Sequence, residues 1–356
     1  MLLYRALSFR ENRNGKVLLR KSRVVVFTLS LSLVLLLSLS TPSHSSSAAA
    51  SSPRVVTVDM YIINVGNVNQ QLGSYSVDMY LSFTWQGNWS ATSNNASAPA
   101  LPSRFEFTNG QITTMNLIEA DRNISGTGYN YLDYRVKGTF YAPFNFERYP
   151  LDKQVLLVNM EDGYYNNATL VYAPSNHSML DPAVQIPGWI IQNGSTSLSI
   201  SNHLYNTTFG YPNSLTTAQS YYSRATFSIT VSRPVTTSLL QLGLPTIVLV
   251  VLSMIMFRIS MENFDSRLQV GVISIFTGVA FLLSLDSNIP ASGYFTLADQ
   301  MMVTIFATIL YSIAMTVWFH RYDPKNLPTY IRRINTASFA LIPIVVIDLL
   351  ILLIVF

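Results

Sequence analysis

The chain has 356 residues, of which 49% are hydrophobic and only 11% are charged. Soluble domains carry about 25% charged residues, so this composition, with its positive mean hydropathy, indicates a membrane protein. The net charge of +4 is small and lies largely in the first 23 residues, so no nucleic-acid partner is expected. The chain has no cysteine, which excludes disulfide bonds and thiolate metal sites.

The N-terminus has the layout of a secretory signal. A basic region that ends at Arg23 is followed by an apolar run from Val24 to about Leu39, and then by small residues with an A-x-A pattern at 48–50. This layout predicts a cleaved signal peptide over residues 1–50, with an uncleaved anchor as the alternative. In both cases the part that follows is exported.

From about Pro53 to Arg233 the sequence is polar, rich in Asn, Ser, Thr and Tyr, and alternates with a period of two. One face of segment 75–85 carries Tyr75, Val77, Met79, Leu81, Phe83 and Trp85. Several such segments are separated by Gly, Asn, Pro and Ser clusters, as strands are. Residues 53–233 are therefore predicted to form one all-β extracellular sandwich that binds ligand.

Four long apolar runs follow, each with close to the 20 residues that span a bilayer as a helix. They predict helices over residues 236–257, 267–287, 298–320 and 335–356, so that residues 234–356 form a four-helix transmembrane domain. The loops after the first and third runs are basic, whereas loop 287–299 has acidic but no basic residues. Because basic loops stay inside, the β domain and the C-terminus are expected outside the cell.

Three motifs occur in an order that resembles one family. The segment FNFERYPLDKQ at 144–154 looks like a signature loop with a Pro-x-Asp core, Gly188 and Trp189 precede a later strand, and SRP at 232–234 leads into the first span. Together they resemble the pentameric ligand-gated ion channels, or Cys-loop receptors, and the missing loop cysteines resemble the prokaryotic members. The resemblance implies a homopentamer around a central pore, in the lipid bilayer of a cell membrane, without a cofactor.

Helical steps of three and four residues along the second span define one stripe, polar at its ends and apolar in its middle. Its members are Gln269, Ile273, Phe276, Ala280, Leu283 and Ser287. A stripe of this kind can also be a helix-packing face. These positions match the family's pore face, so the resemblance implies that they line a pore, whose apolar middle can close by dewetting.

Two acids, Asp265 and Glu262, lie just before the inner end of this stripe. A ring of acids at a pore mouth concentrates cations. The chain reads FDSR where the family's anion-selective members have a Pro-Ala insertion, so selectivity for monovalent cations is predicted. Arg267 lies beside these acids, and an ordinary pair of charges at the membrane surface is the alternative interpretation.

The family's ligand site lies between subunits and is built from aromatic side chains on separate loops. Tyr80 matches one of its positions and is a large aromatic residue on the polar face of its strand. The other matching positions are Phe107, Tyr164, Tyr165, Phe209, Tyr211, Tyr221 and Tyr222. An aromatic cage suits an ammonium group, so the implied agonist is a small molecule such as an amine. With 20 tyrosines in the chain, however, some would lie near any cleft.

Coupling between the two halves is expected where they meet. Arg233 resembles the family's basic residue that pairs with the signature loop, here Asp152 near Pro150. Pro290, which follows the second span, belongs to the same expected set. The family's acidic partner on the first hairpin is absent, since NVNQQLGSY contains no acid. A purely structural salt bridge is the alternative to a role in gating.

Three functions are compatible with these patterns. The main prediction is a channel opened by an extracellular small molecule. A channel of the same fold opened by protons is the second, because carboxylates of the β domain can titrate although the second span has no His. A membrane-anchored binding protein that does not conduct is the third, but it would need one span rather than four. The sequence contains no phosphate loop, metal-ligand pair or nucleophile with a recognisable base, so no catalytic or metal site is expected.

Overall fold

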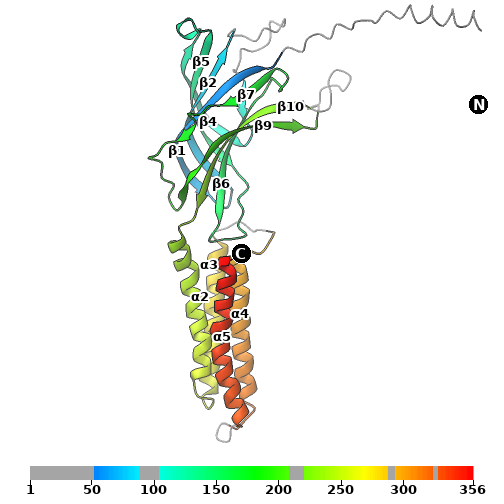
Figure 1. Cartoon of the computed structure of the whole chain (residues 1–356). Coiled ribbons are helices and arrows are strands. Elements are labelled where there is room, and N and C mark those ends of the chain that lie inside the picture. The colour runs from blue at the N-terminus through cyan, green and yellow to red at the C-terminus, as the bar shows by residue number, and fades with distance from the viewer. Residues whose placement is uncertain (1–51, 88–103, 208–219, 288–292, 324–327, 356) are drawn as a thin grey trace, which may run out of the picture. The chain divides into compact units, whose positions relative to one another are not determined.

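The computed structural model describes residues 52–87, 104–207, 220–287, 293–323 and 328–355. The predicted signal peptide at 1–50 lies outside these ranges, as do Phe209, Tyr211 and Pro290. Within them, ten strands are followed by four long helices (Figure 1). The predicted fold class, a β-sandwich followed by a four-helix transmembrane bundle, is confirmed at the level of one subunit.

The strands form two sheets, which we call sheet A and sheet B. Sheet A has the order β4 (Gly110–Asp121), β5 (Tyr129–Tyr141), β2 (Ser74–Gln86), β1 (Arg54–Asn69) and β7 (Leu170–Pro174), and β8 (Met179–Leu180) also pairs with β1. Sheet B has the order β3 (Phe105–Phe107), β6 (Lys153–Asp162), β10 (Ser220–Ser232) and β9 (Ile190–Tyr205). A short 3-10 helix, Ile124–Gly126, precedes β5.

The core lies between the two sheets because each strand directs its apolar face inward. All six side chains that were assigned to one face of segment 75–85 are buried, and Ala225, Phe227, Ile229 and Val231 of β10 are buried opposite them. The hydroxyl of Tyr75 crosses this core: it donates to the carbonyl oxygen of Leu157 (2.5 Å) and accepts from the same residue's N–H (2.6 Å). These two bonds connect β2 to the backbone of β6.

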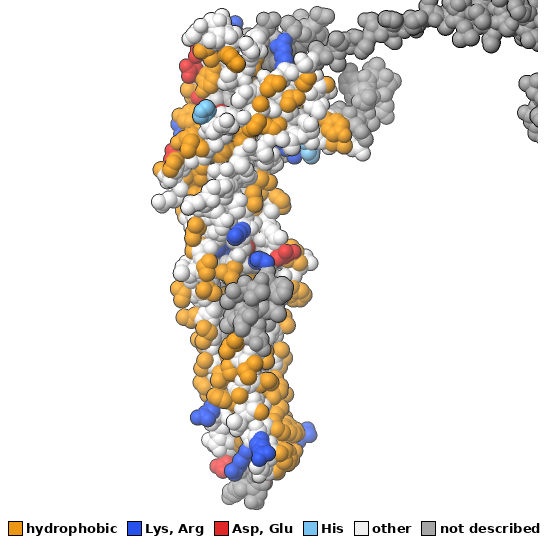
Figure 2. Space-filling model, in the orientation of Figure 1, with side chains coloured by type: hydrophobic (Ala, Val, Ile, Leu, Met, Phe, Trp, Pro, Cys, Tyr) orange, Lys and Arg blue, Asp and Glu red, His pale blue; other side chains and the backbone are white. Residues whose placement is uncertain are grey.

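The helices are α2 (Val235–Arg258), α3 (Phe264–Asp286), α4 (Leu297–Phe319) and α5 (Thr329–Val355). Each is long and apolar enough to cross a membrane, and Figure 2 shows the helical part covered largely by hydrophobic side chains. The chain is therefore a multi-pass membrane protein. The last helix begins at Thr329, before the predicted start at residue 335, because its first turns include the basic residues at 332–333, which the apolar run did not cover. A capping box between Thr296 and Asp299 starts α4.

The helix α3 packs against α2 and α4 through its small residues. A Cβ on Gly271 would lie 2.6 Å from Cγ1 of Ile313, and a Cβ on Gly278 would lie 2.9 Å from Cε1 of Phe306, both on α4. Small residues allow this close approach of helix backbones in a membrane. One side of α3 is therefore committed to packing within the subunit, which leaves its other side free.

Candidate functional site

The free side of α3 carries the stripe predicted to line a pore. Its six members, from Gln269 to Ser287, are all exposed on the subunit. The exposed fractions of Ile273, Phe276 and Leu283 are 58%, 72% and 65%, which is high for large apolar side chains. Because a single subunit encloses no pore, the lining role of this stripe stays a prediction. The packing-face alternative does not hold within the subunit, where the opposite side of α3 does the packing.

At the inner end of α3 the acidic side chains are exposed and the basic side chain is buried. Asp265 and Glu262 are exposed, whereas Arg267 is only 2% exposed. Arg267 donates through Nε and Nη2 to the carbonyl oxygen of Ile259, at 2.9 and 2.5 Å. Among the described residues it forms no ion pair with either acid, so the alternative of an ordinary surface charge pair does not match this geometry.

An aromatic cluster lies on the outward face of sheet B, and we call it the sheet-B cluster. The ring of Tyr205 contacts His203 at 4.6 Å and Tyr222 at 5.7 Å between centroids. The hydroxyl of Tyr205 donates to Oε2 of Glu161 (2.9 Å), and Nε of Arg224 donates to Oε1 of the same carboxylate (2.5 Å). Burial, together with the bond to Glu161, raises the pKa of Tyr205. The cluster presents aromatic rings above a paired, buried carboxylate.

The remaining aromatic residues predicted for the ligand site lie in different surroundings. Tyr164 is 47% exposed and lies under the guanidinium of Arg104 at 5.6 Å. Tyr165 is buried in the sandwich core, and Phe107 is half-buried against it. Tyr221 is exposed but shares the core-side face of β10. Ligand contact by these four therefore stays a prediction, and the core positions of Tyr165 and Phe107 do not support it.

The carboxylate of Asp162 shapes the loop that carries Tyr164. Its Oδ1 accepts from the backbone N–H of Tyr164 (2.9 Å) and of Tyr165 (2.6 Å). Burial raises the pKa of Asp162, although these two bonds oppose the effect. Within the described ranges, no group of three or more His, Cys, Asp and Glu side chains could hold a metal ion. Asp162 therefore acts here as a buried loop anchor.

Tyr80 lies on the outward face of sheet A, with its ring 5.6 Å from the guanidinium of Arg135. Arg135 donates to both oxygens of Asp78, from Nε at 3.2 Å and Nη2 at 3.0 Å, and Lys137 pairs with the same carboxylate at 3.1 Å. Burial opposes ionisation of Asp78, but the bonds from Arg135 and Lys137 outweigh it and lower its pKa. Tyr80 and the sheet-B cluster point away from the core on opposite sheets, so they cannot meet within one subunit.

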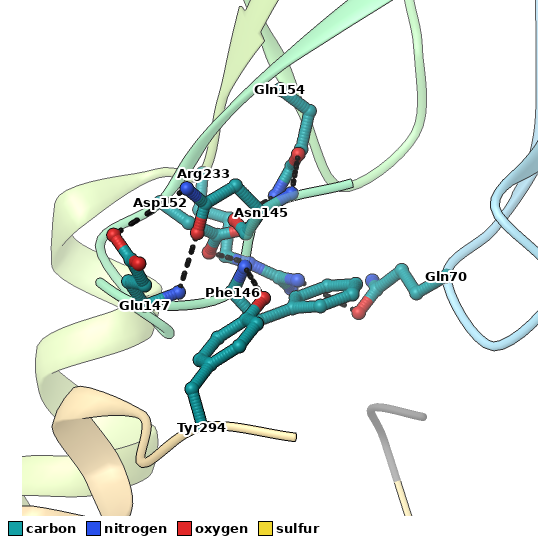
Figure 3. A network of polar contacts seen from close by, with 8 residues as sticks. All are labelled: Gln70, Asn145, Phe146, Glu147, Asp152, Gln154, Arg233 and Tyr294. Carbon is teal, nitrogen blue, oxygen red and sulfur yellow. Dashed lines mark hydrogen bonds and ion pairs between the residues drawn. The ribbon is translucent and has the colours of Figure 1, made fainter. Parts of the chain in front are cut away.

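The predicted pairing of Arg233 with Asp152 is present in the structure (Figure 3). Nε of Arg233 donates to Oδ1 of Asp152 at 2.5 Å, and only 1% of the Asp152 side chain is exposed. The Arg233 guanidinium also lies 4.7 Å from the rings of both Tyr149 and Trp189. Nη2 of Arg233 donates to Oε1 of Gln70 on the first hairpin (2.7 Å). The amide of Gln70 thus contacts Arg233 from the first hairpin, where the family's acidic partner is absent from the sequence.

The signature loop connects the sandwich to the helices. The phenol oxygen of Tyr294 accepts from the N–H of Phe146 at 2.9 Å (Figure 3), and the carbonyl of Glu147 accepts from the N–H of Leu297 at 2.9 Å. Apolar contacts accompany these bonds. Phe146 and Tyr149 join a cluster with Leu242, Leu249, Leu285, Ala298, Met301, Met302, Ile305 and Ile309. Pro150 is buried in the same loop, next to Asp152. The loop is therefore built into the top of the helix bundle.

Several residues of these networks were not predicted from the sequence. Gln70 carries no charge, so the sequence gives no signal that it is a partner of Arg233, although an amide oxygen accepts a hydrogen bond from Arg. Trp189 belongs to a sequence motif, but the motif does not indicate its contact with Arg233. The roles of Tyr205 and Glu161 depend on cross-strand pairing, for which a strand pattern gives no signal.

Comparison with known proteins gives a consistent set of relatives, although no family model matches the chain. It is 23% identical over 201 residues to the pH-sensitive chloride channel 2 of Drosophila melanogaster, covering 53% of this chain and 36% of the fly protein. It is 22% identical over 182 residues to the human gamma-aminobutyric acid receptor subunit rho-1, covering 50% and 35%. It is 20% identical over 278 residues to the human rho-2 subunit, covering 72% and 56%.

The chain thus spans about a third of the fly channel and of rho-1, and about half of rho-2. All three relatives are channel or receptor subunits, which supports the prediction that the chain is not an enzyme. The motif order, the sandwich with four membrane-length helices and these relatives agree with one another. Together they support the resemblance of the chain to the Cys-loop receptor superfamily of pentameric ligand-gated ion channels.

Proposed function

We propose that the chain is a subunit of a ligand-gated ion channel, in which five copies surround a pore lined by α3. The observation that carries this proposal is the two-sided character of α3. Its small residues pack within the subunit, while a continuous stripe of exposed side chains runs along the opposite side. Lining a shared pore accounts for a stripe that is apolar in the middle and polar at both ends.

The proposed topology places the channel in a cell membrane, with the sandwich and the C-terminus outside. The basic loops after α2 and α4 support this orientation through the positive-inside rule. Binding of the agonist would then occur on the extracellular side, and the acidic residues Asp265 and Glu262 would lie at the cytoplasmic mouth.

The proposed agonist site lies between neighbouring copies. Tyr80 on sheet A of one copy and the sheet-B cluster of the next are the aromatic surfaces that would close around a ligand. Each cation–π contact with an ammonium group is worth roughly 0.5–2 kcal/mol, so a small amine fits this set. Tyr80→Ala and Tyr222→Ala should both weaken activation by the amine that opens the channel, and unchanged activation in both variants would reject this site.

Protons are a second candidate agonist, and two carboxyl groups favour them. Burial raises the pKa of Asp133 and of Asp162, so both take up a proton at a higher pH than an unperturbed Asp does. The fly relative is also named as pH-sensitive. Current that follows extracellular pH steps in the absence of any amine would distinguish proton gating from amine gating.

The proposed selectivity for monovalent cations rests on side chains alone. The exposed acids Asp265 and Glu262 and the buried Arg267 support it, whereas the fly relative is named as a chloride channel. The sign of the reversal potential in a salt gradient decides between selectivity for cations and selectivity for chloride. Asp265→Ala should move that potential toward the value for chloride, and an unchanged value would remove Asp265 from the selectivity mechanism.

The decisive experiment is patch-clamp recording of the expressed chain during pH steps and perfusion with small amines. The expected result is a current that appears with one of these stimuli and ends on washout. Absence of current under all conditions, with surface expression established by labelling, would refute the channel and leave a binding protein. Lipid composition should be kept constant, because the four spans contact the bilayer directly.

A further inference from the structure

Two Asn-Gly pairs within the described ranges lie in contrasting surroundings. Asn109 and Gly110 stand at the start of β4, whereas Asn193 and Gly194 lie inside β9. In such a pair the side-chain amide and the next backbone nitrogen are neighbours, and glycine adds no side chain that would shield this nitrogen. The two groups are therefore close enough to react with each other wherever the local structure allows them to meet.

The pair Asn193–Gly194 lies in a bulge of an edge strand. β9 forms one edge of sheet B (Figure 1), and its residues 192–195 stand opposite the single residue Thr230 of β10. Both Asn193 and Gly194 are exposed. Oγ of Ser195 donates to the carbonyl oxygen of Thr230 (3.1 Å), which holds the bulge against β10. The pair is thus accessible to water while its strand stays in place.

The backbone of this bulge accounts for the glycine but not for the asparagine. Gly194 has a φ of +69°, a conformation that residues with a Cβ rarely adopt. The side chain of Asn193 forms no hydrogen bond within the part of the chain that the structure describes, so it does not hold the bulge together. Its amide can therefore turn toward the backbone nitrogen of Gly194.

The other Asn-Gly pair is held in place. Nδ2 of Asn109 donates to the carbonyl oxygens of Tyr141 (2.9 Å) and Leu157 (2.7 Å). Its Oδ1 accepts from the N–H of Asn159 (2.9 Å). These three bonds must break before the amide can reach the nitrogen of Gly110, which requires local opening of the sandwich. The same two residue types thus form one free pair and one protected pair.

We propose that Asn193 is a site of spontaneous deamidation, a covalent modification that places a new carboxylate on the edge of sheet B. The backbone nitrogen of Gly194 loses its proton to hydroxide and attacks Cγ of Asn193. The side-chain nitrogen takes up a proton from water and leaves as ammonia, which gives a cyclic succinimide. Water then opens this ring to aspartate, or to isoaspartate, in which the main chain runs through Cγ. Both products carry a negative charge that the amide lacked.

The modification would change the strand that leads away from the Arg233–Asp152 pair. Trp189, whose ring lies 4.7 Å from the Arg233 guanidinium, directly precedes β9, and Asn193 follows in the first turn of chain after it. Isoaspartate also adds a carbon to the main chain of the bulge. A bulge already contains residues that the ladder leaves unpaired, so it can take up this carbon without loss of the sheet. The modified chain should therefore stay folded and accumulate.

The test follows both pairs by peptide mass spectrometry in purified full-length protein that is incubated at mildly alkaline pH. The protein is made in bacteria without a glycosylation machinery, because Asn-Gly-Ser at 193–195 is also an acceptor for N-glycosylation and a glycan would block the amide. We expect Asn193 to deamidate at least about tenfold faster than Asn109, whose three hydrogen bonds must break first. Isoaspartate is identified by enzymatic methylation of its carboxylate.

The same chain denatured in urea is the reference, because both pairs are then free and should react at similar rates. Asn193→Gln is the matched variant, since its longer side chain forms the ring far more slowly, and methylation should fall to background. An intact amide at Asn193 in the folded protein, while the denatured chain deamidates, would overturn the proposal. Equal rates at Asn109 and Asn193 in the folded protein would overturn it as well. None of these measurements depends on ion conduction.

Discussion

Removal of the Asp152 carboxylate should be the most damaging small change at the junction of sandwich and helices. In Asp152→Asn the shape is retained, but Arg233, whose side chain is 13% exposed, loses its counter-ion. Breaking a buried ion pair from one side costs about 3–5 kcal/mol. The side-chain carbonyl of Gln70 and the rings of Tyr149 and Trp189 still contact Arg233. We therefore expect the free energy of unfolding to fall by about 3 kcal/mol, the lower end of this range.

The partner change is Arg233→Met, which places an apolar side chain of similar length between the same two rings. By itself it leaves the Asp152 carboxylate buried, with Gln154 as its remaining side-chain donor among the described residues. Asp152→Asn combined with Arg233→Met removes both charges. The double variant should then lose less than the sum of the two single losses, by about 2–3 kcal/mol.

The assay is thermal and chemical unfolding of the purified full-length chain in detergent, followed by tryptophan fluorescence. Lys153→Met is the matched control, because it removes an exposed charge next to Asp152 and should change stability by less than about 0.5 kcal/mol. Additive losses in the double variant would refute the reasoning. So would a loss in Asp152→Asn that is no larger than the loss in the control.

Three further changes test other parts of the molecule. Gly271→Ala should destabilise the bundle by about 1–3 kcal/mol, since its Cβ would lie 2.6 Å from Ile313, whereas Gly243→Ala meets nothing within 4 Å and should be neutral or stabilising in the same melting assay. Phe276→Ala should raise the open probability recorded without agonist, because exposing a phenyl side chain to water rather than burying it costs about 1.5–3 kcal/mol. An unaltered open probability would exclude Phe276 from the gate. Burial raises the pKa of Asp133 above 3.8, so the folded state binds this proton more tightly than the unfolded state does. The free energy of unfolding should therefore rise as the pH falls through the range just above 3.8. Asp133→Asn should remove this part of the measured pH dependence.

Sequence patterns predicted the elements because the forces that shape them act locally. A period of two placed Tyr75 through Trp85 on one face, and the same side chains are buried because β2 has sheet B on one side only. Apolar length predicted the four spans because a helix must satisfy its own backbone in lipid. The pore stripe followed from helical periodicity, although its meaning came from the family resemblance.

The contacts that give the site its chemistry depend on residues far apart in the chain. Gln70 meets Arg233 across 163 positions, and Arg267 meets Asn335 across 68. No periodicity relates such pairs, so a neighbouring charge such as Asp265 was the natural partner to expect for Arg267. Tyr205 lies in a polar strand with weak alternation, and its link to Glu161 exists only because β9, β10 and β6 are adjacent in sheet B.

Two ion pairs mark the two ends of one strand pair. Arg224 and Glu161 are opposite each other at the end that carries the sheet-B cluster, and the pairing of β10 with β6 then runs without a register shift to Ser232 and Lys153. The next residue of each strand toward the helices belongs to the Arg233–Asp152 pair. Because Arg233 leads directly into α2, a sliding movement of β10 against β6 would strain both pairs together. The proposed ligand cluster and the top of the bundle are thus joined by the continuous pairing of β10 with β6.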